Sequence, residues 1–193
     1  MRWPVCKRHL NGRQKPSANM GNSAVGLVLV LLASPVLAAD FTGKVVGVLD
    51  GDTTEVVHNG RPERIRLNGI DCPEKGQAYG RRAKEATSDL AFGKDVTLKR
   101  YGLDKYGRTI GDVILPNGQV LNQELVRAGL CWWYRKYAPD NATLQTLEAE
   151  ARAAKVGLWR DPDPIPPWVF RRLKRGVAID AADLPSLSGR PAL

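Results

Sequence analysis

The chain has 193 residues and a formal net charge of +9. Five of its cations lie before residue 40, so the remaining residues carry only +4, and bulk charge alone does not indicate a nucleic-acid binder. Beyond residue 39 the only cysteines and histidine are Cys72, Cys131 and His58, which excludes an ordinary structural zinc site.

Residues 1–39 have the layout of a secretory signal peptide. A basic start without acidic residues precedes an apolar run that ends at Leu37, and the small residues Ala38 and Ala39 follow. The run contains a proline and is shorter than the roughly 20 apolar residues of a membrane span, so cleavage is favoured over an uncleaved anchor. Met20 is an alternative start. We therefore expect a periplasmic or secreted protein that contacts a membrane only if the leader is retained.

Residues 40–160 are expected to form one domain that begins with three strands. Apolar and polar residues alternate between residues 40 and 59, interrupted by the turn dipeptide Asp50-Gly51. Asn59-Gly60 is a strong signal for a type I′ hairpin turn. Residues 64–67 alternate in the same way and predict the third strand.

Helices and two more strands follow in the chain. They are predicted at 77–92 (helix), 94–100 and 109–115 (strands), 121–128 (helix) and from about 140 to 157 (helix). Five short strands with an interposed helix predict an α+β, mainly β fold: a five-stranded OB-type barrel with about three helices.

Residues 161–193 are expected to form an extended tail. Prolines stiffen its start, and the small, polar, aperiodic sequence after Arg175 predicts disorder. The basic cluster between Arg171 and Arg175 is expected to be a solvated face, with an interaction element as the alternative.

Asp52 and Asp71 lie at a turn and at a strand end of the predicted meander. Asp52 follows the turn between the first two strands and Asp71 ends the third, so both carboxylates can reach one edge of the barrel. Nearby carboxylates repel unless a cation or proton lies between them. Oxygen ligands without histidine suit calcium or magnesium, and the carbonyl of Cys72 can add a neutral oxygen. Taken alone, Asp50-Gly51-Asp52 is also explained as a simple hairpin turn.

Arg66 and Arg108 come from distant parts of the chain and are predicted to form a phosphate clamp. A guanidinium group presents a planar fork that matches two phosphate oxygens. Metal and arginine together stabilise the charge that develops during phosphodiester hydrolysis. Either arginine taken singly is also explained as an ion-pair partner. Glu74 is a candidate to orient or deprotonate the attacking water, with a solvated loop carboxylate as the alternative.

The chain resembles the staphylococcal nuclease-like (thermonuclease) family between about Phe41 and Trp159. The resemblance rests on several motifs in the expected order: Asp50-Gly-Asp-Thr53, Arg66-Leu-x-x-Ile-Asp-Cys-Pro-Glu74, Asp104-Lys-Tyr-Gly-Arg108, Asn122-x-Glu-Leu-Val-Arg-x-Gly-Leu130 and Gly157-Leu-Trp159. Separate motifs in a fixed order are a more specific signal than any one of them.

The resemblance implies a role for each matched residue. One Ca²⁺ would be bound by Asp52, Asp71 and the backbone carbonyl of Cys72, with Asp50 supporting these ligands. The catalytic residues would be Arg66, Glu74 and Arg108. The nucleotide would lie along Lys105, Tyr106 and Tyr137, through phosphate and stacking contacts.

Two positions depart from the family pattern. Cys72 stands where the family often has threonine, a change that keeps a carbonyl ligand and removes a hydroxyl. Arg135, beside Tyr134, stands where a second nucleotide-binding tyrosine is familiar, so we expect Arg135 to contribute to nucleotide binding and leave the base preference open.

Cys72 and Cys131 are the two cysteines that remain after the leader. An even number of cysteines in an exported protein favours a disulfide, and two separate, partly buried thiols are the alternative. The family fold places the neighbourhoods of residues 72 and 131 close together, so the resemblance implies a Cys72–Cys131 bridge.

The sequence thus predicts an exported, calcium-dependent endonuclease that cleaves DNA and/or RNA, by resemblance to 3′-phosphate products. We expect a monomer without a stable protein partner. The alternative is a catalytically silent OB-fold module that binds nucleic acid or protein. Such a module would have lost part of the site, whereas this chain retains all five residues: Asp52, Asp71, Arg66, Glu74 and Arg108.

Overall fold

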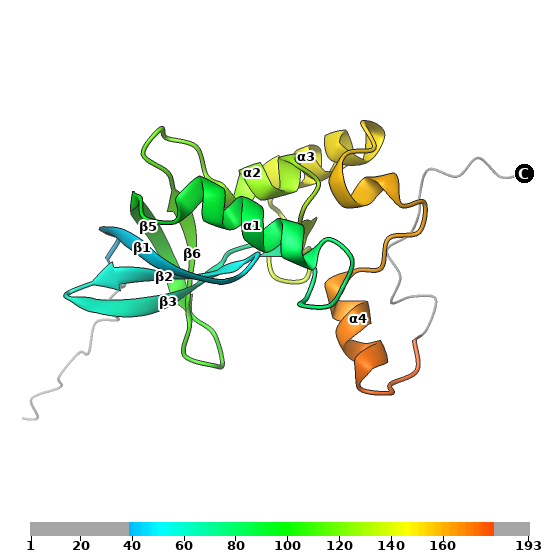
Figure 1. Cartoon of the computed structure of the whole chain (residues 1–193), viewed down its shortest axis with the longest axis horizontal. Coiled ribbons are helices and arrows are strands. Elements are labelled where there is room, and N and C mark those ends of the chain that lie inside the picture. Colours follow the sequence, from blue (N-terminus) through cyan, green and yellow to red (C-terminus); the bar gives the residue numbers. More distant parts are fainter. Residues whose placement is uncertain (1–38, 180–193) are drawn as a thin grey trace, which may run out of the picture. The chain divides into compact units, whose positions relative to one another are not determined.

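The computed structural model describes residues 39–179, and Figure 1 shows the elements of this part of the chain. The predicted signal peptide, apart from Ala39, and the last 14 residues of the predicted tail lie outside the described residues. The strands are β1 (Phe41–Asp50), β2 (Thr53–His58), β3 (Arg61–Leu67), β4 (Ile70–Asp71), β5 (Asp95–Leu103), β6 (Thr109–Ile114) and β7 (Trp132–Trp133). The helices are α1 (Gly80–Ala91), α2 (Leu121–Arg127), α3 (Ala142–Ala153), the 3₁₀ helix η1 (Gly157–Arg160) and α4 (Pro167–Lys174).

Five strands close into a barrel in the order β1-β2-β3-β6-β5. The first three form an antiparallel meander, and β5 pairs with both β1 and β6. Parallel pairing of β3 with β6 closes the barrel. This is the strand order of an OB-type barrel, so the predicted fold class is confirmed.

The local signals explain most of these elements. Asn59 and Gly60 have φ angles of 50° and 75°, as the predicted type I′ turn requires. The three predicted helices correspond to α1, α2 and α3, and the side chain of Asn141 caps α3 by accepting from the Leu144 amide. The sequence analysis did not predict α4, η1 or the short β4–β7 pair.

Each of the five barrel strands contributes at least one aliphatic residue to the barrel interior. Its fully buried residues include Val45, Val56, Ile65, Leu98 and Val113. Helix α1 packs against β1 and α2, and α2 packs against α3 and β6 (Figure 1). None of the helices between residues 39 and 179 combines the length and the apolar character that a membrane crossing needs.

A second, smaller apolar cluster joins the last helices to the domain. Trp132, Ala151, Leu158 and Trp159 are its buried members. Trp168 of α4 packs against this cluster. The segment beyond residue 160 is therefore tied to the body of the protein by aromatic packing, at least as far as α4.

Gly129 and Gly157 let the start of η1 approach the turn that follows α2. Gly157 has a φ of 56°, and a Cβ atom there would lie 2.1 Å from the carbonyl oxygen of Gly129. The amide of Leu158 donates to that same oxygen over 2.8 Å. Both the backbone conformation and the contact therefore require glycine at position 157.

We expect Gly157→Ala to lower the free energy of unfolding by about 2 kcal/mol or more, measured by urea denaturation. Gly118→Ala is the matched control. Gly118 also has a positive φ, 82°, but a Cβ atom there would meet nothing within 4 Å. Equal losses in the two variants would show that backbone strain alone matters and that the close approach does not.

Candidate active site

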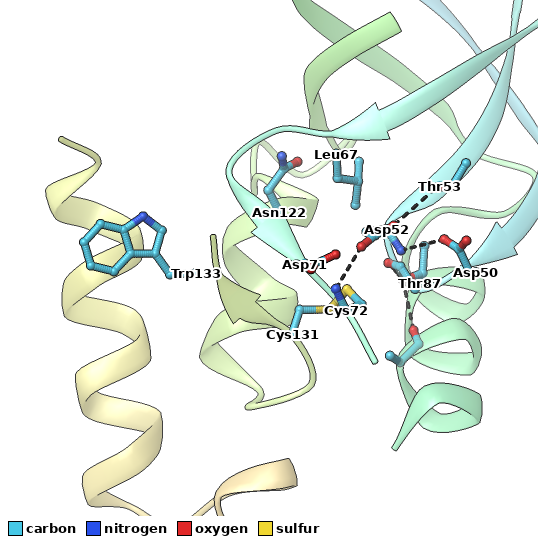
Figure 2. The surroundings of a disulfide bond; sticks show 12 residues. Asp50, Asp52, Thr53, Leu67, Asp71, Cys72, Thr87, Asn122, Cys131 and Trp133 are labelled. Carbon is cyan, nitrogen blue, oxygen red and sulfur yellow. Dashed lines mark hydrogen bonds between the residues drawn. A yellow bond between two sulfur atoms is a disulfide. The ribbon is translucent and has the colours of Figure 1, made fainter. Parts of the chain in front are cut away.

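The turn from Asp50 to Asp52 is buried against helix α1. The hydroxyl of Thr87 donates to the carbonyl of Gly51 over 2.7 Å, and a Cβ atom at Gly51 would lie 2.8 Å from the Cβ atoms of Ala83 and Cys72. Asp50 accepts a hydrogen bond of 3.1 Å from the amide of Asp52. Figure 2 shows this turn beside the cysteines. The tripeptide thus forms the hairpin turn between β1 and β2, as the simpler explanation predicts, and this turn is buried in the site.

Cys72 and Cys131 form a disulfide that lies directly behind the acidic residues (Figure 2). The amide of Cys72 donates to Oδ2 of Asp52 over 2.8 Å. The preceding residue, Asp71, pairs with Trp132 in the β4–β7 ladder. The bridge and the ladder together fix the backbone that carries Asp71.

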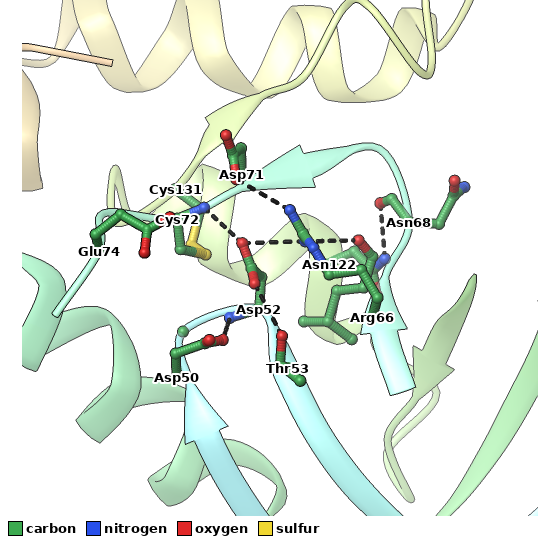
Figure 3. A network of polar contacts seen from close by, with 12 residues as sticks. Asp50, Asp52, Thr53, Arg66, Asn68, Asp71, Cys72, Glu74, Asn122 and Cys131 are labelled. Carbon is green, nitrogen blue, oxygen red and sulfur yellow. Dashed lines mark hydrogen bonds and ion pairs between the residues drawn. A yellow bond between two sulfur atoms is a disulfide. The ribbon is translucent and has the colours of Figure 1, made fainter. Parts of the chain in front are cut away.

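Arg66 lies between the two buried aspartates. Its Nη1 is 3.0 Å from Oδ2 of Asp52, and its Nη2 is 3.0 Å from Oδ1 of Asp71. Figure 3 shows the guanidinium between the two carboxylates. The Asp71 side chain is only 1% exposed. The structure therefore brings together three residues that the sequence analysis proposed for one site.

The crowding of buried carboxylates raises two pKa values. Burial raises the pKa of Asp71 to about 6, and the charge of Asp52 adds to this rise while Arg66 and Arg171 oppose it. Burial also raises the pKa of Asp50 to about 6, again with a contribution from Asp52. The local field thus favours an additional positive charge at this edge of the barrel.

Arg108 reaches the same region from the turn before β6. The parallel pairing of β3 and β6 sets Ile65 opposite Thr109, which brings Arg108, the residue before Thr109, beside β3. Its Nε is 2.7 Å from Oδ2 of Asp104, and its Nη1 donates to Oγ1 of Thr53 over 3.4 Å. The pKa of Asp104 is lowered, because hydrogen bonds from Arg108 and Tyr106 outweigh the opposing effect of burial. Asp104 thus holds Arg108 beside Thr53, the residue after Asp52.

Glu74 lies just beyond the disulfide, in the loop between β4 and α1. Its side chain is 38% exposed, and its backbone amide donates to Oε1 of Gln77 over 3.0 Å. One Glu74 carboxylate oxygen accepts a hydrogen bond from Nη1 of Arg171 in α4. Asp71 and Glu74 therefore share an arginine that comes from the predicted tail.

Comparison with known proteins agrees with this geometry. A model of the family described as staphylococcal nuclease homologue matches residues 64–161. A protein of Escherichia coli O157:H7 named as an uncharacterized endonuclease is 48% identical over 150 residues, which cover 78% of this chain and 97% of the relative. A micrococcal nuclease of Shigella flexneri is 42% identical over 163 residues, which cover 80% of this chain and 94% of the relative. The chain belongs to the staphylococcal nuclease family.

Membership of the staphylococcal nuclease family confirms the resemblance that the sequence motifs indicated. The protein is a nuclease, an enzyme that hydrolyses phosphodiester bonds. The matched region contains five of the predicted catalytic and metal-binding residues: Arg66, Asp71, Cys72, Glu74 and Arg108.

The residues predicted to contact the nucleotide lie in two groups. Lys105 and Tyr106 are in the turn beside Arg108, and the Tyr106 side chain is exposed. Tyr137 is also exposed and lies between β7 and α3, where its ring meets that of Tyr134 edge-on with the ring centroids 4.9 Å apart.

Arg135, the other predicted nucleotide contact, lies over the ring of Trp133, and its Nη2 is 3.6 Å from Oε2 of Glu148. This arginine is therefore engaged with its own domain.

The oxygen atoms at the site fit a hard divalent cation. Carboxylates such as those of Asp52 and Asp71 are ligands that Ca²⁺ accepts, together with neutral carbonyl oxygens and water. Between residues 39 and 179, no cluster of three or more His, Cys, Asp or Glu side chains is arranged to hold a metal ion. A cation would therefore rely on backbone, water and substrate oxygens in addition to the two aspartates.

Two residues that shape the site are not among those predicted from the sequence. Asn122 is buried and donates to the carbonyl of Asn68 over 2.9 Å and to Oδ1 of Asp112 over 3.0 Å, which ties the β3–β4 turn to β6. Its position in a motif was visible, but its contacts were not. Arg171 was seen only as one of several basic residues in the tail.

Proposed function

We propose that this nuclease is an exported, calcium-dependent endonuclease that cleaves DNA and/or RNA and leaves 3′-phosphates. The observation that supports the proposal best is the arrangement at one edge of the barrel. Two buried carboxylates, Asp52 and Asp71, flank Arg66 there, and Glu74 and Arg108 lie beside them.

In this proposal Asp52, Asp71 and the carbonyl of Cys72 hold one Ca²⁺. The bound ion supplies positive charge that stabilises the phosphate as it gains negative charge during the reaction. Asp50 supports the turn that carries Asp52, through its hydrogen bond to the Asp52 amide. The carboxyl groups of Asp50 and Asp71 are buried near Asp52, and a cation would offset the repulsion between these carboxylates.

The proposed reaction uses the other three residues directly. Glu74 accepts a proton from a water molecule as the water oxygen bonds to phosphorus. The bond between phosphorus and the 5′-oxygen breaks, so the phosphate remains on the 3′-oxygen of the upstream fragment. The 5′-oxygen of the downstream fragment takes a proton from solvent water and leaves as a hydroxyl group. Arg66 and Arg108 donate hydrogen bonds to the phosphate oxygens, on which negative charge accumulates.

The proposed nucleotide contacts extend from this edge of the barrel. Tyr106 and Tyr137 offer exposed rings for stacking on bases, and Lys105 offers a charge for the backbone. Arg135 would have to exchange its contact with Glu148 for one with substrate. Stacking of this kind tolerates every base, because each base has an aromatic face.

Export is proposed from two independent features. Residues 1–39 have the layout of a signal peptide. The Cys72–Cys131 disulfide also supports an oxidising compartment, because structural disulfides are rare in the cytosol.

A cleavage assay on closed circular single-stranded DNA and on a structured RNA tests this proposal. We expect cleavage with Ca²⁺ and none with a chelator. The products should carry 5′-hydroxyl ends, which a polynucleotide kinase labels without prior phosphatase treatment. Circular DNA has no ends, so its cleavage identifies an endonuclease. Full activity in chelator would contradict the calcium requirement, and 5′-phosphate ends would contradict the proposed bond cleavage.

A further inference from the structure

Helix α4 carries an arginine into the acidic part of the site. Nη2 of Arg171 is 2.6 Å from Oδ2 of Asp71, and Nη1 is 3.2 Å from Oδ1 of the same carboxylate. Nη1 also donates to Oε1 of Glu74. The family model matches residues 64–161, so this arginine lies beyond the matched region.

Helix α4 is held in place by contacts of its own. The ring of Trp168 stacks on Tyr134 with centroids 5.1 Å apart and an interplanar angle of 4°, and Val169 is only 1% exposed. The side chain of Gln77 donates to the carbonyl of Ile165 over 2.6 Å. The helix begins with Pro167, which suits the first turn. Arg171 is therefore directed toward Asp71 by a packed element and not by a loose end of the chain.

The contacts of Arg171 conflict with cation binding. Both oxygens of Asp71 accept from Arg171, and Oδ1 also accepts from Arg66. A Ca²⁺ ion would need an Asp71 oxygen at about 2.3–2.6 Å, in the space that the guanidinium nitrogen approaches. The two positive charges would also repel one another at this distance. Glu74, which would accept the proton of the attacking water, is engaged by the same guanidinium.

We propose that Arg171 sets the affinity of the site for divalent cations by competing with them for Asp71. The proposal rests on the proposed calcium-dependent function. A cation binds only to molecules in which the Arg171 guanidinium has withdrawn from Asp71. The apparent affinity is then lower than the intrinsic affinity by the fraction of molecules in that state. The same withdrawal frees Glu74, so that binding of the cation and release of the proton acceptor occur together.

Isothermal titration calorimetry with CaCl₂ in the absence of nucleic acid tests the competition. We expect Arg171→Gln to bind Ca²⁺ about tenfold more tightly than the unaltered full chain, as it would if about nine-tenths of the molecules hold Arg171 on Asp71. Arg171→Lys keeps the charge and loses the two-pronged contact, so its affinity should lie between the two. Lys174→Gln removes the same charge from an exposed position of α4 and should leave the affinity unchanged.

Several outcomes would overturn this proposal. They are equal or weaker binding by Arg171→Gln, an equal gain in Lys174→Gln, or no binding by any of the proteins. Thermal melts of each variant establish that it is folded, and Arg171→Lys provides the comparison if Arg171→Gln is not. The cleavage assay on the same samples separates the two hypotheses. Chelator-sensitive cleavage by the unaltered protein, with no gain in affinity for Arg171→Gln, would reject the competition and leave the proposed function standing.

Discussion

Glu74→Gln is expected to lower kcat by about 10²–10⁴-fold, because glutamine cannot accept the proton of the attacking water. The side chain is 38% exposed and lies in a loop, so the variant should keep its fold. The loss should become smaller as the pH rises, since hydroxide ion attacks without a base. The measurement is the pH dependence of kcat with Ca²⁺ at a saturating concentration.

Glu150→Gln is the matched control for this variant. Glu150 is an exposed residue of α3, and its replacement removes the same charge without touching the site. Undiminished cleavage by Glu74→Gln, or a loss that does not change with pH, would argue against Glu74 as the proton acceptor. A similar loss in Glu150→Gln would point to an effect of net charge on substrate binding.

Breaking the Cys72–Cys131 bridge is expected to lower the free energy of unfolding by about 4 kcal/mol. The reason is that a closed loop of this length restricts the entropy of the unfolded chain. The two cysteines are 59 residues apart in the sequence, and both are buried. The bridge also fixes Cys72, whose backbone amide donates a hydrogen bond to Asp52. Reduction should therefore weaken cation binding and cleavage in addition to stability.

Urea denaturation with and without a reducing agent measures this effect. The double variant Cys72→Ala/Cys131→Ala is the control, because its stability should not respond to the reducing agent. If the oxidised protein has two free thiols, or if reduction leaves its stability unchanged, the bridge does not contribute as expected.

Much of the fold and half of the site follow from local sequence signals. The alternation of strands and the Asp50-Gly51 and Asn59-Gly60 turns predict the meander and the place of Asp52 on it. Asp71 is predicted to end the third strand, but it lies in the separate β4–β7 pair, which depends on a long-range contact. The order of the family motifs along the chain assigns Arg108 to the same site, although it is distant from Asp52 and Asp71 in the sequence. Its actual place depends on the parallel β3–β6 pairing, a long-range contact that no local period reveals.

Helix α4 shows why the remainder could not be predicted. Its prolines indicate an extended segment, yet Pro167 occupies the first turn of a helix, where it is tolerated. The helix is stabilised by packing of Trp168 on Tyr134 and by burial of Val169, both of which depend on tertiary structure. Arg171 therefore looks like one more solvated cation in the sequence, and only the folded chain places it on Asp71.

The β3–β6 pairing has a consequence for the order of events during synthesis. Arg66 is on one of these strands and Arg108 directly precedes the other, so the two arginines come to the same side of the barrel only when these strands pair. A partly folded chain therefore lacks the pair, whatever local structure it has gained. Catalytic competence should then appear together with complete folding, which would spare the nucleic acids of the producing cell while the chain is still being made.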